Sequence, residues 1–162
     1  MKRIFSPWRM KYIKDKDIHD ERTGCIFCTL PGNPSDEENL IIHRGELAFV
    51  IMNRFPYTSG HLMVAPYVHV NSLELLDEQT QAEVMRLVSR CIRVLRAVYK
   101  PDGFNVGMNI GSAAGAGFAE HVHFHIVPRW VGDANFMSTT GEVRVLPEAL
   151  EVTWSRIHEA WG

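Results

Sequence analysis

Three histidines of this chain, His121, His123 and His125, alternate with the apolar residues Val122 and Phe124. Alternate residues of an extended chain point to the same face about 6.5–7 Å apart, so one face of a strand here would carry three imidazoles. The apolar residues between them would turn to the opposite face and enter the core. Imidazole titrates near neutral pH and can act as a nucleophile, as an acid or base, or as a metal ligand. The pattern therefore predicts a functional site on this strand.

Two cysteines, Cys25 and Cys28, form a C-x-x-C motif. Two thiolates at this spacing suit one tetrahedral zinc ion, but a closed site needs four ligands. The histidines that could complete such a site are His43, His61, His69 and His121. The alternative is a pair of buried, reduced cysteines without a metal.

A loop without bulky side chains, residues 111–117, leads into the histidine strand. Glycine and alanine allow backbone N–H groups to approach a ligand closely, and consecutive exposed amides form an anion-binding concavity. The alternative is a flexible hairpin loop. Because this loop directly precedes the histidines, the sequence favours a phosphate cradle that includes Gly115 and Gly117.

The elements that must position these groups can be predicted from hydrophobic periodicity. Short apolar runs predict strands over residues 40–44, 47–52, 61–66, 104–110 and 121–127. Pro128 cannot donate to a strand ladder and is expected to end the last strand. An apolar stripe predicts a long helix over 77–100, and a final helix is expected over 147–161. The predicted fold is α+β, an antiparallel sheet of about five strands with one long and one C-terminal helix packed against it.

Length and composition limit the class of protein. A chain of 162 residues fits one domain, predicted over residues 1–162 with an N-terminal arm at 1–22. The net charge of −2 argues against a non-specific nucleic-acid binder, which needs a basic surface. No apolar run has the length of a membrane span. Three cysteines without a disulfide pattern favour a reducing compartment, so a cytoplasmic location is expected.

Residues 121–127 also resemble the signature of the histidine-triad (HIT) superfamily, whose members are nucleotidyl hydrolases and transferases. The continuation through 128–130 and 132–137 is similar to a bacterial group near the fragile-histidine-triad branch, described as dinucleoside polyphosphate hydrolases or phosphorylases. Residues 6–13 resemble the N-terminal arm of that group. The resemblance runs from Trp8 into the C-terminal helix. It implies a homodimer joined into a larger sheet and a nucleotide substrate such as diadenosine tetraphosphate.

The resemblance also implies roles for individual residues. His123 matches the nucleophile that forms a covalent nucleotidyl-histidine, and His125 matches the residue that contacts phosphate oxygens. The predicted nucleotide- and phosphate-binding residues are Asn53, Asn109, Gly115, Gly117 and His125. Relatives commonly carry Ser or Gln where this chain has Gly117, so only a backbone N–H is available there. Asn53 matches a ribose ligand, although Asn also caps turns locally.

A structural zinc ion is implied by the same resemblance. Some relatives combine a C-x-x-C motif with the first triad histidine and a histidine that follows a glycine before a strand. The matching ligands in this chain are Cys25, Cys28, His61 and His121.

Other functions fit the same residues. The three triad histidines could instead bind one catalytic metal, as in a mononuclear metal hydrolase. The chain could also hydrolyse a nucleoside phosphoramidate or another mononucleotide, or act as a nucleotide-binding regulatory module. Arg129 either contacts a polyphosphate tail or pairs with an acidic residue at the surface.

Overall fold

A computed structural model describes residues 24–133 and 148–162. The predicted N-terminal arm at 1–22 lies outside the described residues. The segment 134–147 also lies outside them. It contains most of the motif at 132–137 and the first residue of the predicted final helix. The helices are α2 (Ile26–Thr29), η2 (Leu30–Gly32), α3 (Asp36–Asn39), η3 (Leu73–Leu75), α4 (Glu78–Tyr99), η4 (Ser112–Ala114) and α6 (Leu150–Trp161). The strands are β1 (Ile41–Arg44), β2 (Ala48–Met52), β3 (Leu62–Pro66), β4 (Gly103–Met108) and β5 (Phe124–Arg129).

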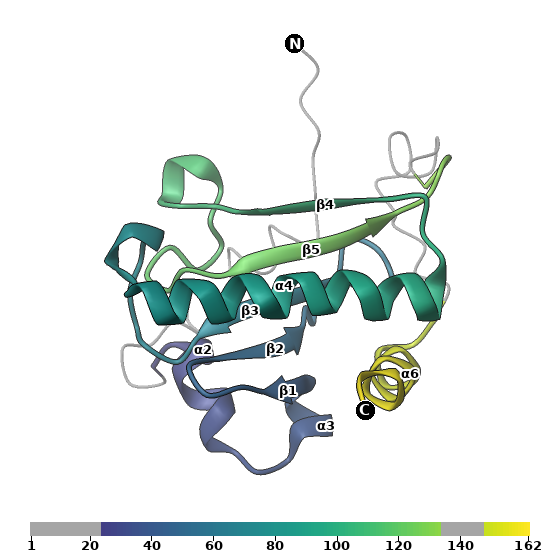
Figure 1. The fold of residues 1–162 in the computed structure, drawn as a ribbon, viewed down its shortest axis with the longest axis horizontal. Helices are drawn as coiled ribbons and strands as arrows, with labels where there is room; N and C mark the ends of the chain where they lie inside the picture. Colours follow the sequence, from purple (N-terminus) through teal and green to yellow (C-terminus); the bar gives the residue numbers. More distant parts are fainter. Residues whose placement is uncertain (1–23, 134–147) are drawn as a thin grey trace.

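The five strands form one sheet in the order β1-β2-β3-β5-β4, and every neighbouring pair is antiparallel (Figure 1). All residues of β2 and β3 are buried, which agrees with their continuous apolar sequences. β5 lies between β3 and β4, so His125 pairs with Met63 on one side and with Gly107 on the other. The predicted α+β fold, with its antiparallel five-stranded sheet and two helices, is confirmed.

The long helix α4 crosses one face of the sheet (Figure 1). It begins after Asp77, whose side chain accepts a hydrogen bond from the Thr80 N–H at 2.8 Å. It ends at Tyr99 and is capped by Lys100, which adopts a left-handed backbone conformation with φ 48°. Its buried stripe completes the core beneath the sheet. None of the helices in the two described segments is long and apolar enough to cross a membrane.

A buried carboxylate ties α4 to the turn between β1 and β2. Glu83 Oε1 accepts hydrogen bonds from the backbone N–H groups of Leu47 at 3.0 Å and Ala48 at 3.2 Å. The turn passes so close that a Cβ atom at Gly45 would meet Glu83 Oε1 and lie 2.6 Å from the Ala48 carbonyl oxygen. Only glycine therefore fits at this position without movement of its neighbours.

The histidine strand differs from the prediction at both ends. β5 begins at Phe124, so His121 and His123 precede the strand, and Pro128 lies within it, opposite Phe104. Pro128 is tolerated because β5 pairs with β3 only through residues 124–126, so its missing N–H removes no bond on that side.

Candidate functional site

The imidazole of His123 is held by the backbone of the same segment. Its Nδ1 lies 2.8 Å from the His121 carbonyl oxygen, and since a carbonyl only accepts, Nδ1 donates. In the neutral ring Nε2 then carries a lone pair. Burial lowers the pKa of His123, and the hydrogen bond to the His121 carbonyl opposes this only in part. An uncharged imidazole with an unprotonated Nε2 is the state that a nucleophile requires.

The burial of His123 is due in part to Phe27, which is 1% exposed. The Phe27 ring lies 4.6 Å from the His123 ring and 5.3 Å from the His121 ring, centroid to centroid. Phe118, next to the glycine-rich loop, packs edge-on against Phe27 at 5.9 Å. Phe27 was not among the residues predicted from the sequence, although its place inside the C-x-x-C motif puts it near any histidine that shares a metal with the two cysteines.

His125 contacts His61 rather than Cys25 or Cys28. His61 Nε2 lies 3.0 Å from His125 Nδ1. On its other side, His61 Nδ1 accepts the backbone N–H of Tyr57 at 3.2 Å and lies 3.4 Å from the side-chain nitrogen of Asn53. The structure therefore brings together Asn53, His61 and His125, which sequence analysis assigned to different tasks.

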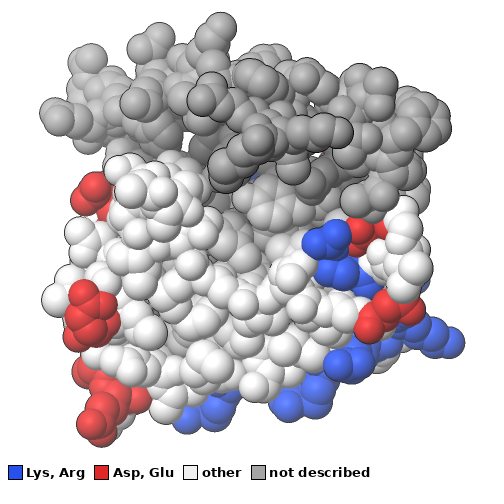
Figure 2. All heavy atoms as spheres, turned by 90° about the horizontal axis from the view of Figure 1, so that it is seen from above, with Lys and Arg blue, Asp and Glu red and all other residues white. Residues whose placement is uncertain are grey.

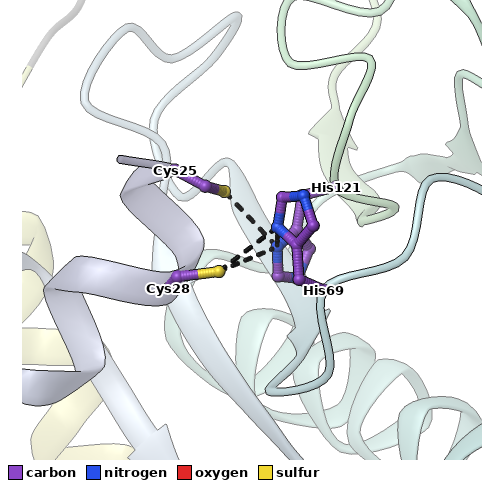
Figure 3. Close-up of side chains that lie close together, drawn as sticks. All are labelled: Cys25, Cys28, His69 and His121. Carbon is purple, nitrogen blue, oxygen red and sulfur yellow. Dashed lines mark hydrogen bonds between the residues drawn. The ribbon is translucent and has the colours of Figure 1, made fainter. Parts of the chain in front are cut away.

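A second cluster joins two sulfur and two nitrogen atoms. The donor atoms of Cys25, Cys28, His69 and His121 all lie within 4.8 Å of one another. The two cysteines of the α2 segment point toward the two imidazoles (Figure 3). His121 Nδ1 lies 3.4 Å from Cys25 Sγ, 3.6 Å from Cys28 Sγ and 3.3 Å from His69 Nδ1. His121 Nε2 donates to the Pro66 carbonyl at 2.9 Å, which leaves Nδ1 unprotonated and directed at the sulfurs.

The chemistry of this donor set fits a tetrahedral metal ion. Two cysteine sulfurs and two imidazole nitrogens are a common ligand set for structural zinc. Burial raises the pKa of the Cys28 thiol, and the adjacent Cys25 raises it further. Burial also lowers the pKa of His121, with the neighbouring His69 and His123 acting in the same direction. A cation would favour the thiolates and the neutral imidazoles together.

The expectation that His61 belongs to this cluster is wrong, and the antiparallel pairing of β3 with β5 gives the reason. Leu62 lies opposite Ile126 and Val64 opposite Phe124, so the segment that precedes β5 lies near the end of β3. His121 therefore meets Pro66 and the loop with His69, whereas His61 lies at the opposite end of β3. Within the two described segments, the side chains close enough to hold a metal group His121 with Cys25, Cys28 and His69, and not with the other two triad histidines.

The glycine-rich loop is partly closed on itself. Gly111 and Gly115 have φ angles of 79° and 84°, and η4 lies between them. The Gly115 N–H donates to the Ser112 carbonyl at 3.0 Å, so this amide is engaged within the loop. Gly117 is exposed, and its neighbour Phe118 connects the loop to Phe27. Asn109, half-buried at the end of β4, stays a predicted nucleotide contact.

Arg129 is paired within the protein. Its guanidinium donates two hydrogen bonds to the Asp133 carboxylate, at 2.6 and 2.7 Å, and one to the Asn105 side-chain oxygen at 2.8 Å. The hydrogen bond to Asp133 raises the pKa of Arg129. Of the two roles predicted for Arg129, the geometry favours the ion pair.

Comparison with known proteins identifies the family. The model of the HIT domain matches residues 35–131. A protein of Mycobacterium tuberculosis named AP-4-A phosphorylase is 40% identical over 167 residues, which cover 100% of this chain and 85% of that protein. A histidine triad nucleotide-binding protein from Sulfolobus tokodaii superposes with a TM-score of 0.68 at 28% identity, covering 85% of this chain and 91% of that one. A zinc-bound histidine triad family protein from Mycobacterium smegmatis also gives 0.68 at 28% identity, with coverage of 86% and 94%. This chain belongs to the HIT family.

Proposed function

We propose that the protein cleaves a dinucleoside polyphosphate, such as diadenosine tetraphosphate, at an α-phosphate through a covalent nucleotidyl-His123. The observation that carries this proposal is the 2.8 Å hydrogen bond from His123 Nδ1 to the His121 carbonyl, which leaves Nε2 unprotonated. The 40% identity to a protein named AP-4-A phosphorylase supports the choice of substrate.

The reaction has two displacement steps. In the first, the lone pair of His123 Nε2 forms a bond to the α-phosphorus, and the bond to the bridging oxygen of the leaving nucleoside polyphosphate breaks. In the second, an oxygen of the acceptor attacks the same phosphorus and the P–N bond breaks, which restores Nε2. His125 would donate a hydrogen bond to the phosphate oxygens, and the Gly117 N–H would do the same. A nucleoside di- or triphosphate leaves readily, so no strong general acid is required.

The acceptor that we propose is inorganic phosphate. With phosphate, diadenosine tetraphosphate would give ADP and ATP, whereas water would give AMP and ATP. The test is chromatographic separation of the products formed with and without phosphate. Faster cleavage with phosphate, with ADP as the new product, supports a phosphorylase. AMP as the only new product at saturating phosphate makes the protein a hydrolase, and the absence of turnover with either acceptor leaves a nucleotide-binding module.

Zinc is the metal that we propose for the Cys–His cluster. Cys25, Cys28, His69 and His121 would hold it, and its contribution is structural because four protein ligands leave no open position for substrate. It would link α2 to the segment that carries the nucleophile. Metal binding also releases free energy that contributes to folding.

A homodimer formed through the edge strand β4 is a further part of this proposal. Figure 2 views the molecule from the side of β4 in Figure 1, and the described part of this face carries mostly uncharged side chains. Val106 and Ile110 are exposed large apolar residues in or next to β4. Pairing of two such edges would extend the sheet and cover these side chains. Light scattering of the purified protein tests whether it forms a dimer.

The cytoplasmic location stays a prediction.

A further inference from the structure

An open cavity of about 660 Å³ lies beside α4, where the turn between β1 and β2 approaches this helix. Sites of roughly 300–1,000 Å³ are large enough to hold a small-molecule ligand. Among the described residues that line the cavity, none belongs to the histidine triad or to the Cys–His group, so it is separate from both candidate sites. β1 is also the edge strand opposite β4, so a dimer formed through β4 would use the other edge of the sheet.

Three arginines of α4 line this cavity, namely Arg86, Arg90 and Arg93. Positions separated by three or four residues are neighbours on a helix, so the three positive charges gather on one face. Arg86 and Arg93 are exposed, and within the two described segments neither guanidinium has a hydrogen bond or an ion pair. Neighbouring like charges destabilise a helix, and a bound anion would relieve that repulsion.

Two carboxylates line the same cavity, but they do not form ion pairs with these arginines. Glu83 Oε1 already accepts the backbone N–H groups of Leu47 and Ala48. Glu46 is exposed in the turn, and no ion pair joins it to an arginine of the described segments. Three guanidinium groups against two carboxylates leave the cavity with an excess of positive charge.

Trp161, at the end of α6, positions two of the side chains that line the cavity. The Arg90 guanidinium donates to the Trp161 carbonyl at 2.5 Å and lies 4.6 Å from the centre of the indole ring. The ring of His43, in β1, packs against the same indole at 5.3 Å, centroid to centroid. Arg90 is therefore held at the cavity wall before a ligand arrives, which reduces the conformational entropy lost on binding.

His43 adds a neutral polar group to this wall. Burial lowers the pKa of His43, the positive charge of Arg90 lowers it further, and the Glu83 carboxylate acts in the opposite direction. The imidazole therefore stays uncharged at neutral pH. In the part of the chain that the structure describes, its ring nitrogens make no hydrogen bond, so the ring N–H can donate to a ligand.

We propose that this cavity is a second ligand site, which binds the phosphate group of a phosphorylated small molecule through Arg86, Arg90 and Arg93. The site goes beyond the proposed function, because it needs neither His123 nor a dinucleoside polyphosphate.

The donors favour a phosphate over a carboxylate. A guanidinium donates in a planar fork that matches two oxygens of one phosphate. A phosphate monoester presents three acceptor oxygens to such donors, whereas a carboxylate presents two. The volume of the cavity also leaves room for an organic group beside the phosphate. Met85, which is exposed, and Leu87 supply apolar surface for that group.

The test is an NMR titration of the full chain, with its metal as purified, in which the backbone amide signals report where a ligand binds. The probe is ribose 5-phosphate, and ribose, which lacks the phosphate, is the matched control ligand. We expect ribose 5-phosphate to shift the amide signals of Gly45, Arg86 and Ser89 in a saturable way, and ribose to leave them unchanged. A titration with 5′-AMP separates the two sources of the phosphate: tighter binding than ribose 5-phosphate at these signals supports a nucleotide, and weaker binding supports a sugar phosphate.

Two variants remove guanidinium groups from the cavity. Arg86→Gln and Arg93→Gln should each weaken binding of ribose 5-phosphate roughly 10-fold, the lower end for loss of a charge-assisted hydrogen bond. Both side chains are exposed, so the fold should tolerate these changes. Arg96→Gln is the control, because it removes the same charge from the same helix at an exposed side chain that packs over Phe104. Its affinity for ribose 5-phosphate should equal that of the wild type.

Three outcomes would overturn the proposal. The first is a wild-type protein in which neither phosphate shifts the cavity signals, and this outcome requires no variant. The second is an equal response to ribose, which would show that the phosphate is not what is recognised. The third is equal weakening in Arg96→Gln and Arg86→Gln, which would reduce the effect to general attraction of anions by the helix. Cleavage of diadenosine tetraphosphate is not measured in this experiment, so failure of the proposed function leaves the result unchanged.

Discussion

His123 Nδ1 donates to the carbonyl oxygen of His121, 2.8 Å away, while the His121 side chain faces Cys25 and Cys28. One residue therefore serves two sites: its backbone orients the candidate nucleophile, and its imidazole belongs to the candidate metal centre. Phe27, between the two cysteines, packs against the same nucleophile. Loss of the metal is therefore expected to disturb His123 from two sides.

His123→Asn is expected to fold normally and to lose turnover of diadenosine tetraphosphate by roughly four orders of magnitude, because the attacking atom is removed. His125→Asn should cost only about 100–1000-fold, the range for loss of one donor to the reacting group. Steady-state kinetics of both variants measures this order. More residual activity in His123→Asn than in His125→Asn would reverse the assigned roles.

The metal ligands can be distinguished by metal content. His69→Ala and Cys25→Ser should each lose most of the zinc, since each removes one of four ligands. His61→Phe should keep it, because His61 lies against His125. Zinc measured by mass spectrometry per mole of protein is the readout. Retention of zinc in His69→Ala together with its loss in His61→Phe would restore the ligand set predicted from the sequence.

Gly45→Ala is expected to lower the free energy of unfolding by about 1–3 kcal/mol, the usual cost of forcing an extra group into a packed site. The new methyl group would press on Glu83 Oε1 and on the Ala48 carbonyl, whose positions hold the turn after β1. Gly32→Ala is the control, since a Cβ there meets no atom within 4 Å. Urea denaturation compares the two, and equal stabilities would show that the turn adapts freely.

The raised pKa of Tyr99 leads us to expect a loss of stability at alkaline pH. Burial, followed by its hydrogen bond to Glu148, raises the pKa of Tyr99 from 10 to about 12. Because the folded state holds this proton more tightly than the unfolded chain, stability is complete below pH 10 and falls as the pH rises toward about 12. Tyr99→Phe lacks the titrating group, so its unfolding free energy should fall less over the same range. If the unfolding free energies of the wild type and Tyr99→Phe fall in parallel with pH, ionisation of Tyr99 does not contribute to the loss of stability.

Much of the fold could be predicted because each strand and helix has its own periodicity. The continuous apolar sequence of β2 and the stripe of α4 identify these elements without knowledge of their partners. The limits of β5 could not be predicted, because they depend on how far β3 and β4 extend beside it. Pro128, for example, remains in the strand only because β3 does not reach it.

The same distinction applies to the candidate site. The triad histidines and the cysteine pair are recognisable from local spacing, although His121 and His123 precede β5 instead of lying within the strand as predicted. The choice between His61 and His69 as the fourth member of the Cys–His group depends on the antiparallel pairing of β3 with β5, which spacing along the chain does not specify. The contact between His61 and His125 depends on the same pairing.

The covalent nucleotidyl-His123 can be trapped by rapid quenching during turnover. Wild-type protein is mixed with excess diadenosine tetraphosphate, quenched at alkaline pH, where a phosphoramidate bond to histidine survives, and digested for mass spectrometry. We expect an adenylyl group on the peptide that contains residues 121–125, assigned to His123 by fragmentation and absent from His123→Asn. Turnover without this adduct under conditions in which a model phosphoramidate survives, or an adenylyl group on any other residue, would contradict it.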